Sequence, residues 1–186
     1  MRAGKGLSLV EVLVTLTLLG ILLSIALPDL ATLVQSTRGE VRMKSLTSHI
    51  ALARSTAVAR KQRVTFCPSA DQRQCGGRWA QGSLLFTDEN GDRRLNAKDV
   101  VLRVSGPLPE GESLTWRAFQ NRAYLQVEPS GFLRYQSGNF TWCPASGDAR
   151  QARQLIVNAT GRTRMALDGD GDGIAEDSRG EPLRCP

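Results

Sequence analysis

The first residues whose spacing could support chemistry are Gly6 and Glu11, at the start of a long apolar run. Cleavage after Gly6 would leave a free α-amino group on Leu7 and would place Glu11 at the fifth position of the shortened chain. A carboxylate in an apolar helix costs on the order of a few kcal/mol, so it is expected to have a charged partner. The sequence therefore predicts cleavage after Gly6 and pairing of Glu11 with a new amine.

A second candidate lies near the C-terminus, where Gly161 is followed by Arg162 and Arg164. Residues two apart on a strand point to the same face, so these guanidinium groups are expected to lie side by side. Their planar shape suits phosphate oxygens. The alternative is that they pair with carboxylates such as Asp168 and Asp170 or solvate an edge strand. Arg150 and Arg153 are candidates for the same phosphate-binding site, and Arg179 and Arg184 also lie nearby in the sequence.

Two acidic loops are candidate calcium sites, because hard cations take oxygen ligands from alternating residues. Residues 88–99 offer oxygens at the first, third, fifth and twelfth places of an EF-type loop, but Arg93 replaces the turn glycine. Residues 168–179 keep that glycine and carry Arg179 where the closing carboxylate belongs. Solvated turns are favoured for the first loop. No metal is expected at the second loop either, but its three alternating aspartates would repel one another without a cation, so calcium binding through Asp168, Asp170 and Asp172 is the alternative.

Four cysteines allow three disulfide pairings. Cys67 and Cys75 enclose a short polar loop, and a bridge between Cys143 and Cys185 would tie the C-terminal tail to a strand end. These two bridges are favoured. Metal binding by the four thiols is the alternative, but the chain has no C-x-x-C pair and the expected compartment is oxidising.

Residues 7–28 are apolar and long enough to cross a hydrocarbon core of roughly 30 Å as one transmembrane helix. A signal peptide is normally cleaved after its apolar region, so cleavage here, which removes only residues 1–6, would leave the anchor in place. Arg2 and Lys5 precede the helix, which predicts a cytoplasmic N-terminus and an external globular region. The net charge of +6 is a modest basic excess and does not by itself indicate which kind of partner the chain binds.

Residues 29–62 are predicted to continue the helix as an amphipathic half, because this range contains no proline and is rich in helix formers. His49, the single histidine, is expected at the surface or on the flank of this helix. An apolar stripe at helical spacing should pack on a sheet. The stripe consists of Met43, Leu46, Ile50, Ala53 and Ala57.

Residues 63–186 form one predicted β-rich region, in which β-prone runs alternate with turn residues. A long helix followed by antiparallel strands is an α+β fold. The expected strands are residues 64–67, 83–87, 100–104, 123–127, 132–136, 140–143, 155–158 and 164–167.

Together, Gly6, Leu7, Leu9, Glu11 and Pro28 resemble the class III signal of type IV pilins and pseudopilins. This resemblance implies a prepilin peptidase that cleaves after the glycine and methylates the new N-terminus. It also implies pairing of Glu11 with the amine of a neighbouring subunit, and other major and minor pilins as partners through the N-terminal helix. Leu7 departs from the Phe or Met that is usual at the first mature position.

The rest of the chain resembles the GspH/FimT (FimU) family, which implies the pilin fold. The residues that carry this resemblance are Cys67, Pro68, Trp79 and the ranges 83–92, 100–103 and 161–164. In the FimT branch a Gly-Arg-x-Arg motif is implicated in DNA capture for natural transformation. This chain matches that motif at Arg162 and Arg164.

The sequence does not favour an enzyme, a small-molecule substrate or a cofactor, because a nucleophile with a nearby base and a phosphate-binding glycine loop are not evident. Calcium is the one alternative to the absence of a cofactor. The resemblance implies a minor type IV pilin, inserted in the inner membrane with its globular region in the periplasm and assembled at or near the tip of a pilus on the cell surface. It could bind double-stranded DNA. The alternatives are a minor pseudopilin of a type II secretion system that recognises exoprotein and a calcium-dependent adhesive tip.

Overall fold

A computed structural model describes residues 8–134 and 136–186, with the side chains of residues 25–33 outside the description. The chain divides into two compact units, Met1–Thr37 and Arg38–Pro186, which we describe separately.

In the first unit the long helix α1 (Leu9–Arg60) begins. Its helical backbone continues through the position of Pro28. The side chains from Leu9 to Leu23 are exposed and mostly apolar. Within the described residues, none of the helices meets the combined length and hydropathy required of a membrane span. The transmembrane segment at residues 7–28 therefore stays a prediction, and Leu7 lies outside the described residues.

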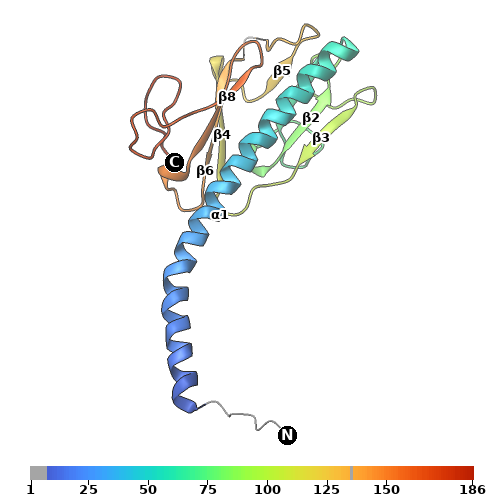
Figure 1. Cartoon of the computed structure of the whole chain (residues 1–186). Helices are drawn as coiled ribbons and strands as arrows, with labels where there is room; N and C mark the ends of the chain where they lie inside the picture. The colour runs from blue at the N-terminus through green and yellow to red at the C-terminus, as the bar shows by residue number, and fades with distance from the viewer. Residues whose placement is uncertain (1–7, 135) are drawn as a thin grey trace. The chain divides into compact units, whose positions relative to one another are not determined.

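In the second unit, α1 packs its apolar stripe against both sheets, as its periodicity predicts. Met43, Ile50 and Ala57 are each at most 2% exposed. The helix ends at Arg60, two residues before the predicted end, and Lys61 adopts a left-handed backbone with φ 52°. Figure 1 shows this half of the helix lying across strands of both sheets.

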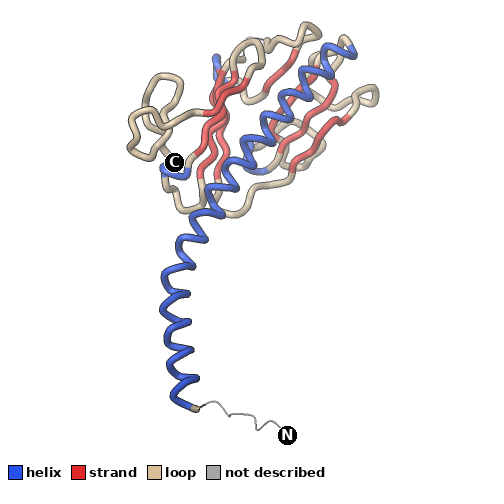
Figure 2. The backbone as a smooth tube through the Cα atoms, viewed as in Figure 1, coloured by secondary structure: helices blue, strands red, loops and turns tan. Residues whose placement is uncertain are grey.

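The described residues form two four-stranded antiparallel sheets (Figure 2). The first has the order β3-β2-β1-β5 and the second the order β4-β6-β7-β8. Their bounds are β1 Val64–Pro68, β2 Ser83–Thr87, β3 Val101–Ser105, β4 Ser113–Ala118, β5 Leu125–Val127, β6 Gly138–Cys143, β7 Arg153–Val157 and β8 Thr163–Met165. Three short 3-10 helices, η1 (Trp79–Gln81), η2 (Phe119–Asn121) and η3 (Ala149–Gln151), lie between strands.

The core between helix and sheets contains a group of aromatic rings packed edge-on or tilted against one another. Trp79 packs edge-on against Phe66 and Phe140, with ring centroids 4.9 and 4.8 Å apart. Close to one end of this core, Gly39 of α1 lies directly on the fully buried Trp142. A Cβ at position 39 would approach the indole ring to 2.7 Å, so a side chain there would have to displace it. This contact explains a glycine inside a helix, where it is otherwise unfavourable.

Two strand predictions were incomplete. Strand β4 was not predicted, although Leu114 and Trp116 alternate with Thr115 and Arg117. Conversely, the strand predicted at residues 132–136 is reduced to a single antiparallel bridge between Leu133 and Val127 of β5, and Tyr135 lies outside the described residues. The N–H of Arg134 donates to the carbonyl of Gln126 in the first sheet, whereas the N–H of Leu133 donates to the carbonyl of Ala159 beside the second, so this segment links the two sheets without forming a regular strand of either.

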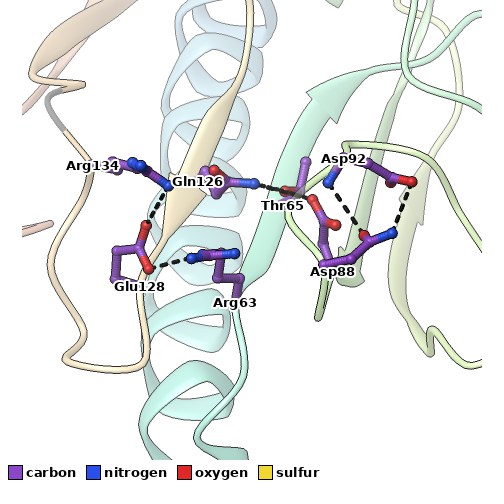
Figure 3. A network of polar contacts seen from close by, with 8 residues as sticks. Arg63, Thr65, Asp88, Asp92, Gln126, Glu128 and Arg134 are labelled. Carbon is purple, nitrogen blue, oxygen red and sulfur yellow. Dashed lines mark hydrogen bonds and ion pairs between the residues drawn. The ribbon is translucent and has the colours of Figure 1, made fainter.

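A buried polar network ties the end of β2 to β1 and β5 (Figure 3). Asp88 is fully buried, and one of its carboxylate oxygens accepts hydrogen bonds from Thr65 Oγ1 at 2.6 Å and Gln126 Nε2 at 3.1 Å. Beside it, Glu128 bridges Arg63 and Arg134. Because the Asp88 carboxylate is buried and bonded to Thr65 and Gln126, it is not available as the first calcium ligand of the loop of residues 88–99. This supports the favoured interpretation of that loop as a turn.

Candidate nucleic-acid interface

The Gly-Arg-x-Arg segment closes the hairpin between β7 and β8. The N–H of Gly161 donates to the carbonyl of Asn158 at 2.9 Å, and Gly161 then adopts φ 72°. A turn followed by a left-handed residue is a common three-residue hairpin loop. The side-chain oxygen of Asn158 accepts from the N–H groups of Thr160 and Arg162. These bonds fix the backbone from which Arg162 projects.

Two features of the structure require a glycine at position 161. A Cβ at this position would lie 2.5 Å from Cδ of Arg54 on α1, in addition to the strained left-handed backbone. Arg54 is itself held in place, since its Nε donates to the carbonyl of Gly131 at 3.2 Å. The glycine therefore shapes the hairpin and allows it to pack closely on the helix.

Both predicted arginines of the motif are exposed. Arg164 belongs to β8 and pairs with Ile156, whereas Arg162 lies one residue before that strand, in the turn. Neither forms an ion pair within the described residues. The carboxylate of Asp168 instead accepts from the N–H groups of Gly171 and Gly173. Pairing of the arginines with that loop, the alternative from the sequence, is not what the structure shows.

The other two predicted phosphate-binding arginines lie elsewhere. Arg153 sits at the opposite end of β7, and its Nη1 donates to the carbonyls of Arg150 and Ala152 at 3.2 and 2.9 Å. Arg150 belongs to η3 and is exposed. The structure therefore gives Arg153 a packing role and does not place it in the hairpin.

The second acidic loop brings four carboxylates together. Ligand oxygens of Asp168, Asp170, Asp172 and Glu176 all lie within 4.8 Å of one another. Glu176 was not predicted, although it occupies the ninth place of an EF-type loop, which often contributes a ligand. The Glu176 carboxylate also accepts from the N–H of Gly169 at 2.8 Å. Carboxylates are the ligands that calcium prefers.

Both favoured disulfides are present, Cys67–Cys75 and Cys143–Cys185. The second holds the C-terminal tail over the face of the second sheet that points away from the helix. Leu183 packs there beside Cys143 and Ala152. Tail and sheet border a groove of about 810 Å³, and its lining includes Arg117, Asn139 and Thr141.

Of the predicted processing residues, Gly6 and Leu7 lie outside the described residues. Glu11 is exposed in the first turn of α1, and its N–H donates to Oγ of Ser8 at 3.2 Å. A serine three residues before a glutamate is a known helix-start pattern, and a carboxylate there is favourable for the helix dipole. Glu11 thus has a local role that is compatible with the predicted intermolecular one.

His49 is half-buried, which fits the predicted position on the flank of the helix. Its ring packs edge-on against Phe66 with centroids 5.5 Å apart, and its Nδ1 is buried without a hydrogen-bond partner in the described residues. Burial lowers the pKa of the His49 imidazole below its ordinary value, and the nearby charge of Arg103 lowers that pKa further. The imidazole is therefore neutral at pH 7 and belongs to the packing between helix and sheet.

Comparison with known proteins identifies the family. Residues 43–161 match the family of the type II transport protein GspH, and residues 1–27 match the prokaryotic N-terminal methylation motif. The chain belongs to the GspH family. This makes it a minor pilin or pseudopilin of the GspH/FimT group, a structural subunit of type IV pili or type II secretion. The methylation motif supports processing by a peptidase and association with other pilins.

Solved structures share the fold. The type IV minor pilin FimU of Pseudomonas aeruginosa matches with a TM-score of 0.51 and 18% identity, over 81% of this chain and 96% of that one. The minor pseudopilin EpsH of Vibrio cholerae matches with a TM-score of 0.50 and 15% identity, over 71% of this chain and 98% of that one. A search of curated proteins gives no match.

Proposed function

We propose that the chain is a minor type IV pilin that is anchored in the inner membrane by residues 7–28, cleaved after Gly6 and assembled at or near the pilus tip. Assembly would use the N-terminal helix, whose side chains between Leu9 and Leu23 are exposed and mostly apolar. The globular region would lie in the periplasm and then on the cell surface. The disulfides fit an oxidising compartment of this kind.

The proposed ligand is double-stranded DNA. The observation that carries this proposal is the pair of exposed arginines Arg162 and Arg164, which no described carboxylate neutralises. Guanidinium groups on a hairpin fixed by Asn158 and Gly161 can bind phosphate oxygens without losing an existing partner. Such contacts are independent of sequence and weaken with salt.

Replacing both arginines, as Arg162→Gln with Arg164→Gln, is expected to flatten the slope of log affinity against log salt by about 1.8, because each phosphate contact contributes about 0.9. At about 0.1 M salt this is a loss of roughly sixtyfold in affinity. Filter binding of the full-length chain in detergent measures it, with Arg73→Gln in the disulfide loop as a charge-matched control. A parent that retains no DNA at low salt would contradict DNA binding.

A minor pseudopilin of a type II secretion system is the second candidate, because this fold also occurs in EpsH. Such a subunit would contact exoprotein instead of DNA. The neighbouring genes decide between the two, since pilus and secretion components are encoded by different sets of partners.

Calcium binding by the loop of residues 168–179 also stays a prediction, and with it the adhesive tip. The four clustered carboxylates repel one another, so a cation should order the loop. Calorimetric titration of chelator-treated protein with calcium is expected to give saturable heat that Asp170→Asn together with Asp172→Asn abolishes. Equal heats for parent and variant would rule the loop out.

A further inference from the structure

The outer face of the second sheet carries a third arginine in line with the hairpin. Strand register places Arg117 of β4 opposite Asn139 of β6, Asn139 opposite Ile156 of β7, and Ile156 opposite Arg164 of β8. Residues directly opposite one another in a ladder project to the same face. One cross-strand row therefore has an arginine at each edge of the sheet.

Arg117 is available for a ligand. It is exposed and forms no ion pair with a described carboxylate. Two acidic residues of the C-terminal tail, Asp177 and Glu181, line the groove that Arg117 also lines. The Asp177 carboxylate is bonded to Nη2 of Arg179 at 3.0 Å and to the N–H groups of Arg179 and Glu181. Neither of the two carboxylates forms an ion pair with Arg117.

The spacing along the row fits a duplex. Three interstrand steps of about 4.8 Å place the Cα atoms of Arg117 and Arg164 roughly 14 Å apart. The major groove of B-DNA is about 12 Å wide, so its two bordering phosphate backbones lie within reach of these long side chains. Between them, Asn139 and Ile156 are half-buried and put no charge on the row.

We infer that Arg117 contacts the second strand of the duplex, while Arg162 and Arg164 contact the first. This rests on the proposed DNA binding and extends it, because the hairpin alone has no means of preferring double-stranded over single-stranded DNA. The row across β4, β6, β7 and β8 provides one. Arg117 is then a specificity-determining residue for duplex, although it is far from the hairpin in sequence.

The test compares a short blunt duplex with one of its single strands, using the full-length chain in detergent. Arg117→Gln is expected to lower duplex affinity roughly eightfold at about 0.1 M salt and to reduce the salt slope by about 0.9, with single-strand affinity unchanged. Arg117→Lys, which keeps the charge, is expected to retain the slope. Arg73→Gln is the control for net charge, and a melting curve for each variant shows that the fold is intact.

Three outcomes would overturn the inference. If Arg117→Gln behaves like Arg73→Gln while the hairpin double variant loses affinity, Arg117 is not a contact and the proposed DNA binding stands. If Arg117→Gln weakens single-strand binding as much as duplex binding, all three arginines contact one strand. If the parent binds neither probe at low salt, the proposed DNA binding itself fails. This outcome is seen with the parent protein and does not depend on any variant.

Discussion

Loss of the Cys143–Cys185 bridge, through Cys143→Ala with Cys185→Ala, is expected to lower the free energy of unfolding by about 4 kcal/mol. The two cysteines are 42 residues apart in the sequence, so the bridge closes a long loop and restricts the unfolded chain strongly. It also holds Leu183 in a small core with Cys143 and Ala152. Urea unfolding of parent and variant under non-reducing conditions measures the difference.

The Cys67–Cys75 bridge is the matched comparison. Its separation is only 8, for which the same chain-entropy account gives about 2.5 kcal/mol. Replacing both of these cysteines by alanine should therefore cost less than removing the C-terminal bridge. Equal losses, or a larger loss from the short loop, would show that loop closure is not the main effect and that local packing decides.

The helix and the Cys67–Cys75 bridge were predictable because their signals are local. Met43, Ile50 and Ala57 repeat with the helical period, and that period alone indicates which face packs on the sheets. Cys67 and Cys75 are separated by only a short polar loop, so the sequence itself indicates that these two cysteines lie close enough to pair. Glu176 could also have been found, because its place in the acidic loop is visible in the sequence.

The position of Arg117 could not be predicted, because it depends on pairing between strands distant in sequence. The alternation of Leu114 and Trp116 with polar residues does indicate a strand at 113–118. Even with that strand, only the register through β6 and β7 shows that Arg117 and Arg164 share a row. Similarly, the role of Gly161 depends on Arg54 of a distant helix.

The second large effect concerns processing. Gly6→Leu is expected to leave essentially all of the protein as the uncut precursor, because a peptidase site that accepts a glycine has no room for a branched side chain. Without a free amine on Leu7, Glu11 would have no partner, and incorporation into fibres should fall with it. Immunoblots of membrane and fibre fractions measure cleavage and incorporation. Ala3→Leu, which lies outside the predicted cleavage bond, is the matched control. Normal cleavage of Gly6→Leu would contradict the assigned site.

The most direct test of the account is the N-terminus of the chain in sheared surface fibres. Mass spectrometry of the N-terminal peptide should find a chain that begins at Leu7, with the methyl group that the family motif implies. A chain that begins at Met1 in assembled fibres would contradict the account, because a retained leader leaves no amine on Leu7 for Glu11 to bind.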